Sequence, residues 1–185
     1  MAAVQTVSCA CGQAEFTLAG EPIMVTECMC DSCRKAGNIM EALDGAPAVL
    51  DAKQATLTAM YRKDRVSCTQ GADNLKEFRL TPDSKTRRVV ATCCNSGMFL
   101  DFTKGHWVDI YGQRWPEQSR PVAEMRTMVG DLQDATALPA DIPNLKTHSF
   151  GFFAKLMGAW AAMGFRTAPI GYVNGRLDIG GKEAA

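Results

Sequence analysis

The cysteines of this sequence are grouped in a way that could do chemistry. Seven of the eight fall in three groups along the chain: Cys9 and Cys11, then Cys28, Cys30 and Cys33, then Cys93 and Cys94. Thiolates this close together can converge on one soft cation, and zinc takes about four ligands in a tetrahedron. The pattern therefore predicts zinc, at one or two ions per chain.

The middle group offers three thiolates and no obvious fourth ligand. Three protein ligands and one open position are typical of catalytic zinc sites, where the open position holds water or a substrate atom. A small thiol suits such a position, since zinc stabilises the thiolate over the thiol. We therefore expect Cys28, Cys30 and Cys33 to be catalytic as well as metal-ligating. Arg34 and Lys35 beside them either lower the pKa of these thiols or are exposed helix charges.

The two cysteine pairs together predict a second, structural zinc site. Cys9 and Cys11 supply half of a tetrahedral shell, and Cys93 and Cys94 could complete it. Such a site would fasten the amino-terminal strand to a strand far along the chain. Adjacent residues in a strand point to opposite faces, so both Cys93 and Cys94 reach one metal only through distorted backbone. Cys93 is the favoured ligand of the two.

The remaining candidates for chemistry stand apart from these groups. Cys68 is isolated, and His106 and His148 are not at ligand spacing from any cysteine, so we interpret all three as non-ligands. No side chain stands out as a general acid or base.

Composition bounds the class of protein. The chain has 185 residues with 20 basic and 20 acidic side chains, which gives no electrostatic case for nucleic acid or an anionic membrane. The start shows no signal peptide, and the apolar stretch at 150–165 is too short to span a membrane and contains Lys155. We expect a cytoplasmic protein, in which reduced thiols favour metal over disulfides.

The first hundred or so residues predict short strands separated by turns, and hence a mainly β fold. The expected strands span residues 14–18, 23–26, 46–50, 57–61, 75–80, 87–92 and 98–102. A short helix is expected after the cysteine triplet, capped by Asp31 or Ser32 and ended by Gly37. The triplet would then lie at a strand-to-helix junction.

The last third predicts a helical extension, so we divide the chain into a β domain at 1–114 and an extension packed on it at 115–185. Pro121 is expected to begin one helix, whose apolar residues recur at helical spacing. Thr147 or Ser149 would cap a second helix that ends at Gly164. An Asn-Gly turn at 174–175 predicts a small hairpin.

The second of these helices carries an apolar stripe, made up of Phe150, Phe153, Met157, Trp160 and Gly164, which Phe152, Leu156 and Met163 widen. We expect the stripe to be core or the interface of a homodimer. The alternative is membrane attachment, but a surface-lying helix usually carries several basic residues on its polar face.

The cysteine motifs resemble those of a known family. The order is Cys-x-Cys-Gly at 9–12, Cys-x-Cys-x-x-Cys-Arg-Lys-x-Gly at 28–37, and a strand that ends in cysteine before Gly97. It resembles the glutathione-dependent formaldehyde-activating enzyme family, which includes the centromere protein V group. The similarity covers about residues 5–112, including Met60-Tyr61-Arg62.

This resemblance implies a β-tent fold of small antiparallel sheets. It also implies a structural zinc at Cys9, Cys11 and the downstream pair, and a functional zinc at the triplet. The implied activity is that of a carbon–sulfur lyase, which condenses formaldehyde with the thiol of glutathione to S-hydroxymethylglutathione.

One motif departs from the family pattern. The family has Cys-x-x-Cys-Gly, whereas this chain reads Cys93-Cys94-Asn95-Ser96-Gly97. Ser96 therefore stands where the second ligand belongs, and a neutral hydroxyl is a poor zinc ligand. Cys94 can replace it if the turn allows; otherwise the structural site is altered, weakened or empty.

Three functions follow from the sequence. The first is a zinc-dependent carbon–sulfur lyase acting on a thiol such as glutathione. The second is a non-catalytic zinc module, with the helical extension as a dimer or partner interface. The third is a redox or metal-handling role in which Cys93 and Cys94 close as a strained vicinal disulfide.

Overall fold

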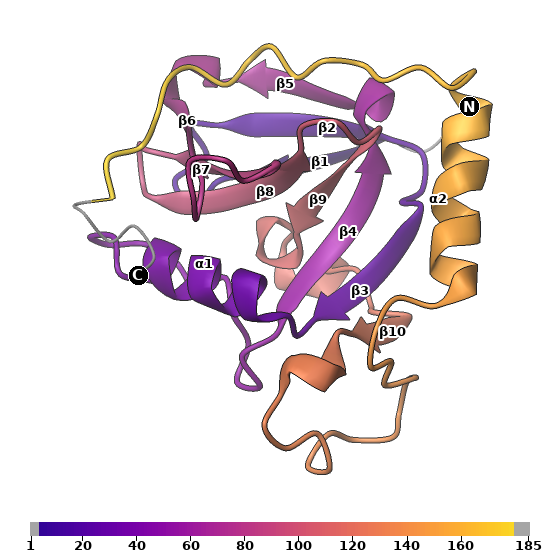
Figure 1. Cartoon of the computed structure of the whole chain (residues 1–185). Coiled ribbons are helices and arrows are strands. Elements are labelled where there is room, and N and C mark those ends of the chain that lie inside the picture. The colour runs from indigo at the N-terminus through magenta and orange to yellow at the C-terminus, as the bar shows by residue number, and fades with distance from the viewer. Residues whose placement is uncertain (1–3, 180–185) are drawn as a thin grey trace.

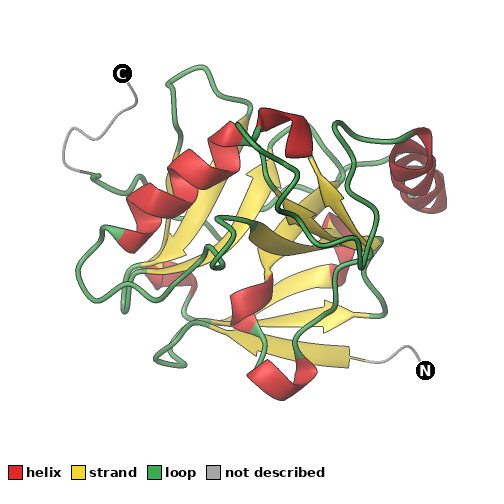
Figure 2. Ribbon diagram, turned by 90° about the horizontal axis from the view of Figure 1, so that it is seen from below, coloured by secondary structure: helices red, strands yellow, loops and turns green. Residues whose placement is uncertain are grey.

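Two β-sheets and two α-helices make up the described part of the chain, residues 4–179 of a computed structural model (Figures 1 and 2). The strands are β1 (Val4–Ser8), β2 (Glu15–Ala19), β3 (Met24–Cys28), β4 (Thr56–Arg62), β5 (Val66–Gln70), β6 (Leu75–Phe78), β7 (Thr86–Ala91), β8 (Ser96–Phe102), β9 (Trp107–Tyr111) and β10 (Met125–Thr127). The helices are α1 (Asp31–Glu41) and α2 (Phe150–Ala162). Single-turn 3₁₀ helices lie between them: η1 (Lys63–Arg65), η2 (Ala72–Asn74), η3 (Gly112–Arg114), η4 (Glu117–Ser119) and η5 (Val129–Asp131).

The small sheet has the order β1-β2-β5, and the large sheet the order β10-β3-β4-β9-β8-β7-β6. Neighbouring strands are antiparallel, except that β10 runs parallel to β3. The predicted fold class, mainly β with a C-terminal helix, is confirmed. None of the described helices is both long enough and apolar enough to cross a membrane.

Six of the seven expected strands coincide with β2, β3, β4, β6, β7 and β8. The expected strand at 46–50 is wrong, since only Leu50 there forms an isolated bridge, to Thr56. A carboxylate takes the place of a strand partner, because the backbone N–H groups of Val49 and Leu50 both donate to Glu41 Oε1 at 2.7 Å. The strands β1, β5, β9 and β10 were not predicted.

The large sheet buries a different kind of side chain on each face, as the period of two in a strand requires. On one face Ala59, Tyr61 and Ile110 pack with Phe16 and Leu18 of the small sheet in the main core. On the other face one row runs in register across four strands: Arg88 of β7, Leu100 of β8, Asp109 of β9 and Met60 of β4. This second face faces the helices.

The helix α1 follows directly on β3, as predicted, but its boundaries differ. Its N-cap is Cys30, whose Sγ accepts a hydrogen bond from the backbone of Cys33, so neither Asp31 nor Ser32 is the cap. Gly37 does not end the helix, which continues to Glu41. A Cβ at Gly37 would lie 2.5 Å from the Leu50 side chain, so this glycine permits close packing.

The helix α2 begins and ends as predicted. Ser149 is the N-cap and its Oγ accepts from the Phe152 N–H at 3.2 Å, while Gly164 adopts a left-handed φ of +64° after the last turn. Of the apolar stripe expected to be core or a homodimer interface, Phe152 and Leu156 are buried in the single chain, where they pack on Met24 and Met60 of the large sheet. Phe150 is 90% exposed, and the homodimer interface stays a prediction.

The helix expected from Pro121 is also wrong, because this segment contains β10. Arg126 of β10 is buried, and its guanidinium binds Glu27 at 2.7 Å and Asp141 at 2.8 Å. Its backbone pairs with β3 on one side and with Pro143 and Leu145 on the other. These tertiary hydrogen bonds and ion pairs outweigh the local spacing of apolar residues.

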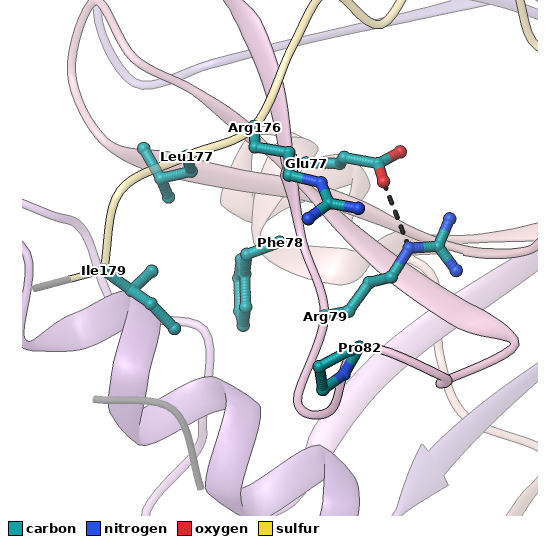
Figure 3. Close-up of a pocket in the computed structure, with 7 residues that line it drawn as sticks. All are labelled: Glu77, Phe78, Arg79, Pro82, Arg176, Leu177 and Ile179. Atoms are coloured by element: carbon teal, nitrogen blue, oxygen red, sulfur yellow. Dashed lines mark hydrogen bonds and ion pairs between the residues drawn. The ribbon is translucent and has the colours of Figure 1, made fainter. Parts of the chain in front are cut away.

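The chain after α2 returns along the molecule to the outer edge of β6 (Figure 1). The expected hairpin at 174–175 is wrong, since Arg176 instead forms a parallel bridge with Glu77. Covering β6 removes an open sheet edge. Figure 3 shows Phe78 beside Leu177 and Ile179 around a cavity of about 70 Å³, which has room for only a few water molecules.

Candidate metal centres

The two cysteine pairs, far apart in sequence, come together in one cluster. The sulfur atoms of Cys9, Cys11, Cys93 and Cys94 all lie within 4.8 Å of one another. The Cys9 sulfur is 3.6 Å from that of Cys11 and 3.7 Å from that of Cys93. A tetrahedral zinc with bonds of about 2.3 Å requires sulfur–sulfur distances of about 3.8 Å. This four-cysteine cluster therefore has the donors and the spacing for one zinc ion.

A turn is what lets two adjacent cysteines face the same point. The strand β7 ends at Ala91 and β8 begins at Ser96, so Cys93 and Cys94 lie in the connection. Asn95 has a left-handed φ of +52°. The opposite-face rule for strands does not apply here, and both sulfurs reach the cluster. In the described chain all eight cysteines are free thiols.

Ser96, which stands in the place of a family ligand, braces the cluster instead of joining it. Its buried Oγ accepts from the Ala10 N–H at 3.0 Å and lies 3.1 Å from the Cys94 sulfur. It thereby ties the loop that carries Cys9 and Cys11 to the turn that carries Cys93 and Cys94. Burial opposes ionisation of Cys94, but contacts from Ser96 and from the Cys11 backbone prevail and lower its pKa to about 6.

The three-cysteine cluster forms where β3 gives way to α1 (Figure 1). The sulfur atoms of Cys28, Cys30 and Cys33 also lie within 4.8 Å of one another. Contacts with the Cys28 and Cys33 side chains lower the pKa of Cys30, whereas the contact with Cys30 raises the pKa of Cys28. Three sulfurs this close together suit the binding of one soft cation.

A cavity of about 600 Å³ opens directly onto all three of these cysteines. It lies over the face of the large sheet that carries the row from Arg88 to Met60, and α2 covers part of it. Its volume is in the range of small-molecule sites. Of the four-cysteine cluster, Cys9 borders a separate cavity of about 450 Å³, which lies next to Arg114 and Trp115.

Asp109 is the acidic group on the floor of this cavity. Its Oδ1 is fully buried and has no hydrogen-bond partner. Burial, followed by the charges of Asp101 and Cys30, raises the pKa of Asp109 to about 7, while Arg88 opposes the shift. Our reading of the sequence missed this residue. An acidic residue inside the Val-Asp-Ile run would have been the signal, had the strand β9 been predicted.

Arg88 supplies the buried positive charge of the cavity. Its side chain is only 1% exposed and donates to the Ser32 carbonyl and to Thr86 Oγ1, both at 3.3 Å, while its Nε has no partner. Arg34 is engaged at the rim, where it binds Asp31 and the backbone carbonyl of Asp131. The positive charge of Arg34 is therefore paired at the rim, and the basic side chain that lines the cavity is Arg88.

The other candidate residues belong to neither cysteine cluster. The imidazole Nε2 of His106 lies 2.9 Å from the Leu156 carbonyl, under α2, and Cys68 donates to the Gln70 carbonyl. His148 borders the cavity and packs on Phe152, with ring centroids 4.3 Å apart. Burial lowers the pKa of His148, so its ring is uncharged at neutral pH.

The sequence profile described as "glutathione-dependent formaldehyde-activating enzyme" matches residues 4–125. The chain belongs to this family. The resemblance predicted from the cysteine motifs is thereby confirmed, and a formaldehyde-activating function with zinc-capable cysteine groups is supported at the level of the family.

A solved structure is also similar to this formaldehyde-activating family member. It is the crystal structure of a Rhodobacter sphaeroides protein, a structural genomics target, with 14% sequence identity and a TM-score of 0.44. The similarity covers 61% of this chain and 89% of that one. No curated protein is significantly similar in sequence.

The family region holds both cysteine clusters, Arg88 and Asp109. The part of the cavity wall formed by Met128, His148 and α2 comes after it. The match extends beyond residue 114, and the division of the chain at that residue stays a prediction.

Proposed function

We propose that this chain is a zinc-dependent carbon–sulfur lyase that adds a thiol to formaldehyde and forms an S-hydroxymethyl product. The observation that carries the proposal is the cavity at Cys28, Cys30 and Cys33, into which the buried Asp109 carboxyl also faces. Metal donors, a space for substrate and a titratable group therefore lie in one place. Both cysteine clusters must stay reduced, so a cytoplasmic setting is part of the proposal.

The donor set fits a catalytic zinc. The sulfurs of Cys28, Cys30 and Cys33 would supply three ligands to the ion, and all three residues border the cavity, which could admit a fourth ligand. Zinc bound there would stabilise a substrate thiolate and act as a Lewis acid. We assign the four-cysteine cluster to a second zinc that is structural, which makes two ions per chain.

Asp109 is the residue that we assign to proton transfer. The addition forms one carbon–sulfur bond, and the proton leaves sulfur and ends on the former carbonyl oxygen. Asp109 Oδ1, which has no other hydrogen-bond partner, can accept this proton and return it to the oxygen. A pKa of about 7 suits both steps, because a group poised near the working pH is able to take and to give a proton.

Arg88 has a positioning role in this scheme. It lies two strands away from Asp109 in the same cross-strand row, and its charge lowers the pKa of Asp109 against the effect of burial. Without it, Asp109 would hold its proton more tightly at neutral pH. The same buried charge also offsets the negative charge of the thiolates.

The experiment is to follow S-hydroxymethyl formation by proton NMR with zinc-loaded protein, formaldehyde, and either glutathione or phenylmethanethiol. We expect acceleration over the protein-free reaction with at least one thiol. The variant Cys33→Ser should lose it, and Cys68→Ser, which lies outside both clusters, should keep it. Equal rates with and without protein for both thiols would refute the proposal.

A non-catalytic zinc module is the second candidate, and one observation favours it. Along α2, Phe150, Phe153 and Met157 are 90%, 53% and 50% exposed in the single chain, which is typical of a contact surface. Sedimentation of wild type and of Phe150→Ser tests whether this stripe joins two copies. A monomer at every concentration would reject the dimer.

A further inference from the structure

The wall of the cavity contains a part that the family region does not supply. Phe152, Phe153 and Leu156 of α2 line it together with His148, and all four lie beyond residue 125. Phe152 and Leu156 are buried against Met24 and Met60. The added helix therefore covers part of the cavity with apolar side chains, of which Phe152 and Leu156 are held by core packing.

Polar groups in this outer wall are few. His148 is uncharged at neutral pH and lies with its ring against Phe152. The wall continues with Leu100, Phe102 and Trp107 of the large sheet. A substrate that fills the space between α2 and the sheet therefore exchanges water for aliphatic and aromatic contacts, which favours an apolar body.

The charges around the cavity also disfavour an anionic substrate. Among the described residues that line it, Arg88 is the one Lys or Arg side chain, whereas Asp31, Asp109 and Asp131 are acidic, and Asp31 pairs with Arg34 at the rim. Arg88 already donates to Ser32 and Thr86. Glutathione carries two carboxylates besides its ammonium group, and apart from Arg88 the lining offers them no basic partner, so each carboxylate left unpaired would cost free energy on leaving water.

From the apolar wall and this distribution of charge we infer that the thiol substrate is uncharged apart from its sulfur. Its body is apolar, with the bulk of an aromatic ring or a short branched alkyl group. The inference rests on the proposed function, since it names the class of thiol that is added to formaldehyde at Cys28, Cys30 and Cys33. Atoms balance as before: the sulfur bonds to the formaldehyde carbon, and the thiol proton moves to the oxygen.

Binding to zinc-loaded protein, measured by isothermal titration calorimetry without formaldehyde, tests the inference independently of turnover. The probes are phenylmethanethiol and glutathione. We expect phenylmethanethiol to bind at least about tenfold more tightly, since its aromatic ring leaves water for the apolar wall. The variant Phe153→Ala should weaken phenylmethanethiol about tenfold and leave glutathione unchanged.

The matched control is Met157→Ala, on the same helix, half exposed like Phe153 but outside the cavity lining. It should bind both thiols as wild type does. Glutathione binding as tightly as phenylmethanethiol, or no effect of Phe153→Ala, overturns the inference and leaves the proposed function standing. Failure of both thiols to bind zinc-loaded protein overturns the proposed function, and the inference with it.

Discussion

The two cysteine clusters use the same ligand chemistry in different surroundings. In the four-cysteine cluster the thiols come from two connections far apart in sequence, and Ser96 braces them from within the core. In the three-cysteine cluster all thiols come from one strand-to-helix junction and border a cavity of about 600 Å³. The four-cysteine cluster joins two segments that are distant in sequence, whereas the three-cysteine cluster has space for a ligand beside its sulfurs.

The comparison teaches that the neighbours of a cluster, more than its cysteines, assign its role. A complete shell of four thiolates holds zinc without a free position, which suits a structural site. Three thiolates next to a cavity and a carboxyl of raised pKa suit chemistry.

The largest effect is expected from removing a ligand of the four-cysteine cluster. We expect Cys93→Ser to lower the free energy of unfolding by about 4 kcal/mol or more, because loss of a structural metal belongs to the most destabilising changes. Urea unfolding with zinc present, followed by circular dichroism, measures it. Cys68→Ser, outside both clusters, should stay within about 1 kcal/mol of wild type. If Cys93→Ser had the same free energy of unfolding as wild type, the four-cysteine cluster would have no structural role.

The complementary variant, Cys33→Ser, should lower the rate of thiol addition. We expect thiol addition to fall about 1000-fold, which corresponds to about 4 kcal/mol of lost transition-state stabilisation. The unfolding midpoint in urea should shift little. If Cys33→Ser destabilised the fold as much as Cys93→Ser, the two clusters would have the same role and the contrast would be lost.

A smaller effect is expected at Asp109. We expect Asp109→Asn to slow the addition about 100-fold at pH 8. In wild type, protonation below about pH 7 removes the proton acceptor, so kcat/KM should fall as the pH drops through that value. The variant should lack this inflection. The control is Asp73→Asn, an exposed residue on η2, which should keep the wild-type pH profile. If the inflection persisted in Asp109→Asn, Asp109 would be excluded as the base.

The smallest effect is expected at Ser96, which supports the four-cysteine cluster by hydrogen bonding. Ser96→Ala leaves the Ala10 N–H without its acceptor, which should cost about 1 kcal/mol of unfolding free energy. Urea unfolding again reports it, with exposed Ser119→Ala as the control. Equal midpoints for the two variants would show that Ser96 merely fills the position of the family ligand.

The sequence predicted the local elements around the three-cysteine cluster well. The strand before Cys28 and the helix after it depend on residues close in the chain, and both are present. The helix expected from Pro121 failed because the ion pairs of Arg126 with Glu27 and Asp141 join segments distant in sequence. The apolar residues of α2 were predicted, but not which of them are buried in the single chain, because packing on the large sheet buries Phe152 and Leu156 and leaves Phe150 exposed.

The chemistry of the metal ligands follows from the amino-acid sequence. Seven cysteines at short spacings are enough to indicate soft-metal sites, because thiolates that are neighbours in the chain cannot lie far apart in space. Only the tertiary structure decided what surrounds them. Asp109 and Arg88 meet the cavity through the register of three adjacent strands, and Phe153 meets it through the packing of α2. Register and helix placement depend on contacts between distant segments, which short-range patterns do not encode.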